Sequence, residues 1–366
     1  MEVLLGKTLT ELQEVALSVG LQKFAGKQLA EWLYVRRVSS FDEMTNISLK
    51  GREALNARYT VGRHAPVREA VSTDGTRKYL FEICQSEGRS NSEAVQQQRG
   101  LTGEAGHFVE TVYIPEDDRA TLCVSSQAGC KMGCRFCMTG TLGFHGHLSA
   151  ADILNQIFAI DQWAMTNDQS QLTNLVFMGE GEPMDNLDNV LRALEILTAD
   201  YGCAWSPKRI TVSTVGIPAM KRFLDESECH LAVSMHNPFP AERATIMPAE
   251  KMMSITDVVA LIRQYDWSHQ RRVSFEYICW AENTTLRHAK ELLRLLKGLN
   301  CRINLIRFHE DLTAKANANA LTASAVSSME FFRDYLTSHG LTTTIRRSRG
   351  EDILAACGQL VNSLQQ

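Results

Sequence analysis

The first sixty residues place apolar side chains at helical spacing. Three amphipathic stretches, residues 9–21, 27–37 and 48–59, are separated by short polar breaks. Apolar residues three and four positions apart share one face of a helix, so each stretch predicts a helix with one buried side. The pattern therefore predicts a small helical module, which we bound at residues 1–75.

The next part of the chain changes from helical to strand spacing. Residues 78–84 and 109–114 are apolar runs that predict two strands. Between them, residues 85–107 contain almost no apolar side chains and predict a mobile polar loop. We interpret residues 76–120 as a hairpin-like connector that carries this loop.

From Leu122 onward, short β-rich runs alternate with amphipathic helical segments. This alternation predicts repeated βα units around a parallel sheet or barrel over residues 121–366. Such folds gather their functional residues at the carboxyl ends of the strands, where Gly179 to Glu182, Ser213, His236 and His309 fall. The runs that predict strands are residues 122–126, 174–179, 209–214, 231–236, 273–278, 303–308 and 342–346.

Composition narrows the class of protein. The chain has 366 residues, of which 44% are hydrophobic and 22% charged, so it can bury a large core. Its acidic first residues do not form a secretory signal, and no run of 18 apolar residues follows. Ten cysteines are too sparse for a disulfide scaffold. We therefore expect a soluble cytoplasmic protein with no membrane partner.

The net charge of the chain does not exclude nucleic acid as a binding partner. The net charge of -4 argues against a generally basic RNA-coating protein. Binding requires only a local basic surface, and two short candidates are Lys208-Arg209 and the group Arg346, Arg347 and Arg349. Each could equally be a set of ordinary solvated charges.

Three cysteines crowd into eight residues, in the run Cys130-Lys-Met-Gly-Cys134-Arg-Phe-Cys137. These short spacings let three thiolates on one loop face a single polynuclear site. An ordinary ferredoxin cluster uses four cysteines, so three ligands leave one iron open to bind a small molecule. The alternative is an incomplete zinc knuckle, but His145 and His147 are badly spaced for the usual pairing of two ligand hairpins.

This cysteine spacing, with Phe136 before the third cysteine, resembles the signature of the radical S-adenosylmethionine (SAM) superfamily. Further segments resemble the RlmN/Cfr family of RNA adenosine methyltransferases across the whole chain except the loop near residues 85–107. The resemblance implies an α/β fold, a partial (β/α) barrel of radical SAM type with a small helical N-terminal accessory domain that binds RNA. The segments are LCVSSQAGCKMGCRFCMTGTLGF, GEGEPMDN, VSTVGIP, VSMHNP, FEY, INLI, RGEDILAACGQL and AGKQLAEWLY followed by SFDEMTNIS.

The resemblance also implies the reaction and its cofactors. Cys130, Cys134 and Cys137 would hold a [4Fe-4S] cluster, and two SAM molecules would be used per turnover. The product would be adenine methylated at C2 in 23S ribosomal RNA, at adenine 2503, and in transfer RNA, at adenine 37. A flavodoxin-like electron donor and a thiol reductant would be the reducing partners.

Three further residues acquire roles from the resemblance. Cys357 would carry the methyl group, and Cys123 would resolve a covalent adduct between Cys357 and RNA. Glu110 would be the base that takes the ring proton, although its local pattern alone reads as a solvent-facing carboxylate on an alternating strand. The basic run before Cys357 could favour its thiolate. The other cysteines, at positions 84, 203, 229, 279 and 301, read as small buried hydrophobic residues.

The SAM contacts implied by the resemblance lie at the predicted strand ends. They are Gly181, Glu182, Ser213, Ser234, Met235, His236 and His309. Two of these positions depart from the family pattern: the turn GMGEP appears here as GEGEP, which adds Glu180, and His309 replaces an asparagine. Residues 279–285 also depart from the usual acidic turn.

Three other functions remain open from the sequence. One is methylation at C8 of the same adenine, the antibiotic-resistance branch of the family, which the cysteines and Glu110 do not separate from C2. Another is a non-catalytic RNA-binding or iron-sulfur assembly protein, which would not need Cys123, Cys357 and Glu110 together. The last is a different radical SAM enzyme, such as a maturase, which has no need of a C-terminal cysteine in this context.

Overall fold

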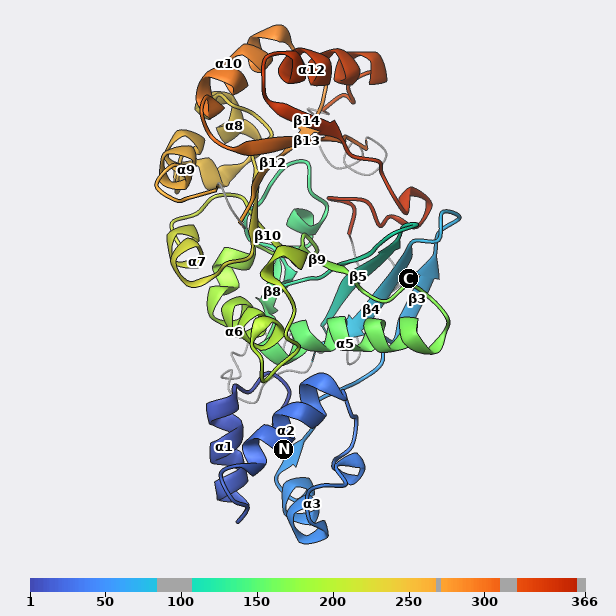
Figure 1. The fold of residues 1–366 in the computed structure, drawn as a ribbon. Helices are drawn as coiled ribbons and strands as arrows, with labels where there is room; N and C mark the ends of the chain where they lie inside the picture. The colour runs from blue at the N-terminus through green and yellow to red at the C-terminus, as the bar shows by residue number, and fades with distance from the viewer. Residues whose placement is uncertain (84–106, 268–270, 310–320, 361–366) are drawn as a thin grey trace, which may run out of the picture.

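The computed structural model describes residues 1–83, 107–267, 271–309 and 321–360. It has a small helical lobe at the start of the chain and a larger α/β lobe (Figure 1). Within these ranges, no helix is long and apolar enough to cross a membrane. The stretch predicted to be a mobile loop, residues 85–107, lies outside the described residues except for His107.

The N-terminal lobe contains the three helices that the apolar spacing predicts. A capping box starts the first helix, since the Thr8 backbone N–H donates to Glu11 Oε2 at 2.7 Å and the Glu11 N–H donates to Thr8 Oγ1 at 3.4 Å. The elements are β1 (Glu2–Val3), α1 (Leu9–Ser18), α2 (Ala25–Ala30), the π-helix η1 (Glu31–Val35), the short helix η2 (Phe41–Glu43), α3 (Leu49–Asn56) and β2 (Tyr59–Thr60).

Polar contacts fix this lobe against two helices of the larger one, α5 (Ala150–Thr166) and α6 (Leu187–Thr198). Arg192 on α6 donates to both carboxylate oxygens of Glu11, at 2.6 and 2.8 Å. On α5, the Asn155 amide exchanges hydrogen bonds with the backbone of His64, both at 3.1 Å. The lobe is therefore held from two directions.

The larger lobe is built on one ten-stranded sheet. Seven neighbouring strands run parallel in chain order, and three antiparallel strands extend the sheet beyond the first of them. The parallel strands are β6 (Ala120–Cys123), β9 (Asn174–Phe177), β10 (Ile210–Thr214), β11 (His230–Ser234), β12 (Val273–Cys279), β13 (Cys301–Arg307) and β14 (Thr342–Ile345), and the antiparallel ones are β3 (Arg68–Val71), β4 (Arg77–Glu82) and β5 (Phe108–Pro115).

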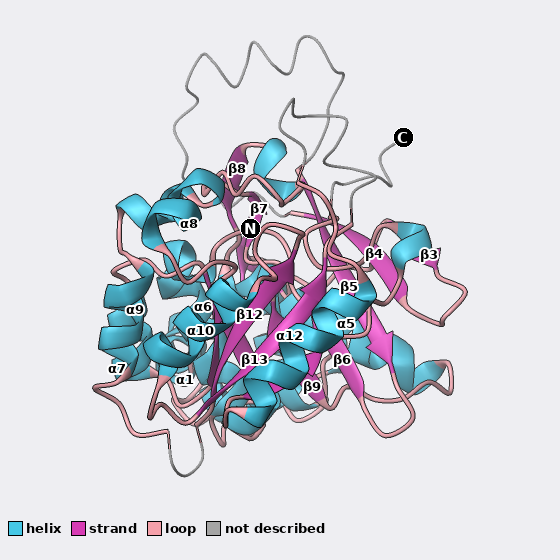
Figure 2. Ribbon diagram, turned by 90° about the horizontal axis from the view of Figure 1, so that it is seen from above, coloured by secondary structure: helices cyan, strands magenta, loops and turns pink. Residues whose placement is uncertain are grey.

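Helices pack around the sheet (Figure 2), and residues of the parallel strands line two cavities. On β10, for example, Ile210 and Val212 are fully buried, whereas Thr211 and Ser213 alternate with them and line these cavities. This partial (β/α) barrel confirms the predicted fold class. Besides α5 and α6, its helices are α7 (Met220–Glu226), α8 (Pro240–Ile246), α9 (Ile255–Ile262), α10 (Leu286–Leu296) and α12 (Val326–Ser338).

Two features differ from the sequence prediction. The strand β3 lies inside the stretch 1–75 that we assigned to the helical module, yet it pairs with β4 in the large sheet. A short hairpin of β7 (Gln127–Gly129) and β8 (Phe144–His147) follows β6 and was not predicted. Both cases involve strands with few apolar side chains, REAV, QAG and FHGH, so no apolar run marks them in the sequence.

The C-terminal segment, residues 346–360, crosses the open side of the barrel. The Gly350 N–H donates to Asp74 Oδ2 at 3.1 Å, in the turn between β3 and β4. Further along, the Gly358 carbonyl accepts from the Met138 N–H at 2.8 Å, next to the predicted cluster cysteines. The segment therefore carries Cys357 to the carboxyl end of the parallel strands.

Candidate active site

The three predicted cluster ligands lie on the loop between β7 and β8. The loop begins at Gly129, whose φ of +65° and closeness to Gly143 O, 1.9 Å from where a Cβ would stand, require glycine. The Cys130 N–H donates to that same oxygen at 2.9 Å. Within the loop, the Arg135 N–H donates to Ile246 O at 2.9 Å. Short strands and backbone contacts thus fix where the cysteines point.

All three thiols line one cavity of about 130 Å³. Burial raises the pKa of all three thiols, and that of Cys130 rises to about 12. Neighbouring thiolates raise the pKa of Cys130 and Cys134 further. A bound cation reverses this preference, because a coordinating thiol is deprotonated. Among the described residues, no three His, Cys, Asp or Glu side chains converge closely enough to hold a single metal ion. In an iron-sulfur cluster each thiolate binds a different iron, so three thiols that share a space fit a cluster.

Phe136, the aromatic residue before the third cysteine, forms one wall of this cavity. Its ring meets that of His236 edge to face, with centroids 4.6 Å apart, and stacks on Trp280 at 6.2 Å. An apolar wall beside the thiols limits water near them. The aromatic position in the sequence motif thus has a packing role that joins the cysteine loop to the strand ends.

Gly181 and Glu182, in the turn that follows β9, line the same cavity. Gly181 has φ +94°, and a Cβ there would stand 2.4 Å from the Gln127 side chain. Burial raises the pKa of Glu182 to about 7, although hydrogen bonds from Thr214, Val215 and Met184 oppose the rise. A nearby ammonium group would favour the ionised carboxylate. This turn fits the amino group of SAM.

Ser213, Ser234 and His236 line the same cavity from the ends of β10 and β11. His236 adopts φ +54°, a strained conformation of the kind found at functional sites. Its Nδ1 accepts from the Ile278 N–H at 3.0 Å, so the ring proton lies on Nε2. Burial, with Arg243 nearby, lowers the pKa of His236 to about 3. The ring is therefore a neutral hydrogen-bond donor.

Two expected SAM contacts lie elsewhere. Met235 is fully buried and does not line the cavity; its carbonyl accepts from Arg243 Nε at 3.0 Å. His309 lines a larger cavity instead and is within 3.1 Å of Ser348 Oγ. The contacts of Met235 and His309 with SAM stay predictions, and neither residue lines the cavity of the cluster cysteines.

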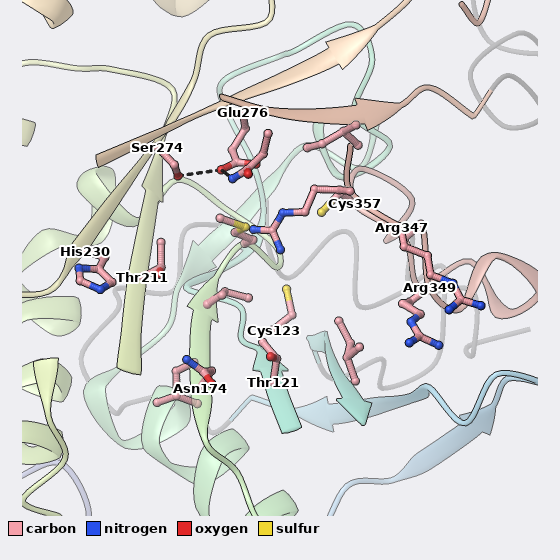
Figure 3. A pocket seen from close by; sticks show the side chains of 18 of the residues that line it. Thr121, Cys123, Asn174, Thr211, His230, Ser274, Glu276, Arg347, Arg349 and Cys357 are labelled. Atoms are coloured by element: carbon pink, nitrogen blue, oxygen red, sulfur yellow. Dashed lines mark hydrogen bonds between the residues drawn. The ribbon is translucent and has the colours of Figure 1, made fainter. Parts of the chain in front are cut away.

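The larger cavity, of about 430 Å³, contains both predicted catalytic cysteines (Figure 3). Cys123 enters it from the end of β6 and Cys357 from the C-terminal segment, and both are free thiols. Cys357 also lines the cavity of the cluster cysteines. Burial raises the pKa of Cys123, and a Cys357 thiolate raises it further. Cys357 is an exposed residue, yet the surrounding protein raises the pKa of its thiol, against the influence of Arg346.

Glu110 is fully buried, unlike the exposed carboxylate that its local pattern suggests. It forms an ion pair at 3.0 Å with Lys78, which is also fully buried. Lys78 Nζ donates to Leu354 O at 3.3 Å, three residues before Cys357. Glu110 lines neither cavity, but it shares a face of β5 with Val112, which packs against Cys123.

Glu180, the departure from the family turn, links this strand to the cysteine loop. Its Oε1 accepts from the Glu110 N–H at 2.8 Å and its Oε2 from the Gly129 N–H at 3.1 Å. Burial raises its pKa to about 8, even though these two hydrogen bonds favour the charged form. The extra carboxylate therefore fixes the backbone of Glu110 relative to Cys130.

Replacing Lys78 by Met tests the buried ion pair. The change leaves the Glu110 carboxylate buried without its cation, and we expect the free energy of unfolding to fall by about 3–5 kcal/mol. Adding Glu110→Gln removes the charge and should restore most of that loss. Denaturant unfolding measures the free energy of unfolding of both variants. Equal stability of the single and double variants would contradict the role of Lys78 as the cation that stabilises the buried Glu110.

The sequence reasoning missed one carboxylate at the centre of the site. Glu276, on β12, lines both cavities, and its Oε1 accepts from Ser274 Oγ at 2.9 Å and from Asn304 Nδ2 at 2.8 Å (Figure 3). A charged residue in the apolar run VSFEYI was an available signal. Glu276 entered the sequence prediction only as part of the motif FEY, with no role of its own.

A parallel partial barrel with three cysteines on one loop at its carboxyl end is the architecture of a radical SAM enzyme. The crystal structure of a radical SAM methyltransferase from Sphaerobacter thermophilus is similar to this one, with a TM-score of 0.85 and 34% identity over 98% of this chain and 99% of that one. This class implies SAM and a [4Fe-4S] cluster as cofactors.

Curated relatives identify the family. A probable dual-specificity RNA methyltransferase RlmN of Bacteroides fragilis is 54% identical over 99% of this chain and 97% of its own length. The dual-specificity RNA methyltransferase RlmN of Syntrophotalea carbinolica is 36% identical over 98% and 89%. The family model "Ribosomal RNA large subunit methyltransferase N-terminal domain" matches residues 3–61. The chain belongs to the RlmN family, as the sequence motifs predicted.

Proposed function

We propose that this protein methylates C2 of an adenine in RNA through a methyl group carried on Cys357. One observation supports this most directly: Cys357 lines both cavities, the small one with the cluster cysteines and the large one with Cys123. A group on its sulfur can therefore meet a cofactor on one side and a substrate on the other. The RNA methyltransferase names of the relatives supply the substrate class.

The first half of the reaction loads Cys357. Its thiolate attacks the methyl group of one SAM, which forms an S–CH3 bond and releases S-adenosylhomocysteine. Gly181, Glu182, Ser213, Ser234 and His236 would orient SAM, with the Glu182 carboxylate facing its ammonium group. When bound to Cys130, Cys134 and Cys137, a reduced [4Fe-4S] cluster supplies the electron that cleaves a second SAM to a 5'-deoxyadenosyl radical.

The second half builds and releases the product. The methyl group on Cys357 would give a hydrogen atom to that radical, and its carbon would then add to adenine C2. A base would accept the C2 proton, and the residue predicted for this role is Glu110, which is buried behind the cavity on the same face of β5 as Val112. The electron that the adduct gives up balances the one spent on SAM. Cys123 then attacks the Cys357 sulfur, so that a disulfide forms and the freed carbon takes a proton. A thiol reductant restores both cysteines.

The partners follow from this scheme. We propose adenines of 23S ribosomal RNA and of transfer RNA as substrates, which agrees with the dual specificity in the relatives' names. A flavodoxin-like protein would supply the electron. The N-terminal lobe, as in the predicted accessory domain, would bind RNA beyond the target adenine.

Product analysis tests the proposal. Anaerobically reconstituted enzyme, SAM, reductant and unmodified RNA should give 2-methyladenosine, measured by mass spectrometry of digested RNA against C2 and C8 standards. Cys134→Ala, which removes one cluster ligand, should give no product and no 5'-deoxyadenosine. Finding 8-methyladenosine would assign the enzyme to the C8 branch, and methylation by the Cys134→Ala variant would contradict radical chemistry.

A further inference from the structure

The cavity that contains Cys123 and Cys357 has a strongly basic lining. Seven Lys or Arg side chains face it and only two Glu, although the chain as a whole carries a net charge of -4. Two of the sequence's basic candidates, Lys208 and the Arg346 group, meet here from distant parts of the chain. The lining cations are Arg119, Lys208, Arg272, Arg302, Arg346, Arg347 and Arg349.

Three of these cations form what we call the basic rim: Lys208, Arg272 and Arg302. They stand at or beside the amino ends of β10, β12 and β13, and all three are exposed. Among the described residues, no hydrogen bond or ion pair involves their side chains, whereas Arg119 on the same cavity pairs with Glu116. The rim is therefore a set of cations that the described part of the protein does not neutralise.

His230 lies close enough to all three cations of the basic rim for their charges to affect its pKa. It lies at the start of β11, between β10 and β12, and lines the same cavity (Figure 3). Burial lowers its pKa to about 4, and the charges of Arg272, Arg302, Arg271 and Lys208 add to this effect. Its Nδ1 accepts from the Arg272 N–H at 3.0 Å, so the neutral ring keeps a donor on Nε2. An anion would relieve the repulsion among these cations and find a hydrogen-bond donor beside them.

We propose that the basic rim binds the phosphodiester backbone of single-stranded RNA next to the target adenosine. This inference rests on the proposed function. A five-residue strand such as β10 is about 16 Å long, so the rim lies well away from the reacting carbon, along the wall of the same cavity. It would hold a neighbouring nucleotide while the target base, turned out of its stack, reaches Cys357.

An acidic electron-transfer protein is the other partner that such a surface could attract. The cluster cysteines, however, lie at the carboxyl ends of the strands, and the rim lies at their amino ends. A donor seated on the rim would therefore approach the barrel from the end farther from the cluster. RNA, which must enter the cavity lined by both cysteines, fits the position of the rim better.

The test compares a triple variant, Lys208→Gln with Arg272→Gln and Arg302→Gln, with the wild-type holoenzyme. Arg209→Gln is a matched control, because Arg209 is exposed beside Lys208 but packs over the Trp205 ring and does not line the cavity. The substrate is a synthetic RNA hairpin with the target adenosine in its loop. At about 0.15 M salt the triple variant should raise KM for RNA roughly tenfold to a hundredfold.

Salt dependence and an RNA-independent step make the result specific. Each lost phosphate contact should reduce the slope of log KM against log salt by about 0.7, so the triple variant should lose about 2. Transfer of a labelled methyl group from SAM to Cys357 without RNA should be unchanged in every variant. If the wild-type enzyme does not transfer this methyl group to Cys357, the proposed function is wrong, and this outcome is distinct from a failure of the rim proposal. An unchanged KM and slope, or slower reduction by flavodoxin with unchanged RNA kinetics, would overturn the rim proposal.

Discussion

With SAM that carries a trideuterated methyl group, we expect the RNA product to contain mainly CD2H. Cys357 should first become a CD3 thioether, and one deuterium should pass to 5'-deoxyadenosine when the methylene radical forms. The other two deuteriums remain on the carbon that joins adenine, and a proton completes the methyl group after Cys123 breaks the carbon–sulfur bond. Mass spectrometry of the nucleosides and of the peptide containing Cys357 measures each step.

The same experiment with Cys357→Ala should lower product formation by roughly a thousandfold or more, because the change removes the sulfur that carries the methyl group. Cys203→Ala is a suitable control, since that thiol contacts the Tyr34 carbonyl in the N-terminal lobe at 3.6 Å and lines neither cavity. A product that keeps all three deuteriums would mean direct transfer from SAM. Full activity of Cys357→Ala would also mean that SAM transfers its methyl group directly to RNA.

Replacing Cys123 by Ala should trap the protein on its substrate. The radical steps require only Cys357, the cofactors and the base, so the carbon–carbon bond should still form. Without the second thiol, the Cys357–RNA thioether has no partner for exchange. We expect a covalent protein–RNA species that approaches one RNA per protein, visible on a denaturing gel and removed by nuclease digestion, with little free methylated RNA.

A buried thiol outside the cavity controls for the loss of a sulfur atom. Cys229 is 2% exposed and lines neither cavity, so Cys229→Ala should turn over normally and show no adduct. Adding Cys357→Ala to the Cys123 variant should remove the adduct. Wild-type turnover by Cys123→Ala would contradict its role in release.

Much of the fold was readable in the sequence because local periodicity follows side-chain direction. The helices of residues 9–59 and every parallel strand of the barrel occur where the apolar spacing predicts them. The position of Ser213 and His236 at strand ends followed from the same pattern. The strands with few apolar side chains, β3 and the β7–β8 hairpin, did not follow from it.

The tertiary structure decided whether charged residues are buried and paired. Glu110 and Lys78 look like ordinary charges on alternating strands, since a carboxylate gives the same letter pattern whether it faces water or a buried ammonium group. Lys78, for example, contacts Leu354 of the C-terminal segment, 276 residues away in sequence. Glu276 shows the same limit, because only the curvature of the sheet places it between two cavities.

The sequence by itself determined the cysteine loop, because three thiols within eight residues must share a small volume, and it determined the succession of strands and helices. Only the tertiary structure brought Cys357 between the cluster cysteines and Cys123, and gathered Lys208, Arg272, Arg302 and the Arg346 group around one cavity. The physical reason is the range of the interactions. Local spacing fixes what neighbours along the chain can do, whereas contacts between distant segments depend on how the barrel closes and where its last segment packs.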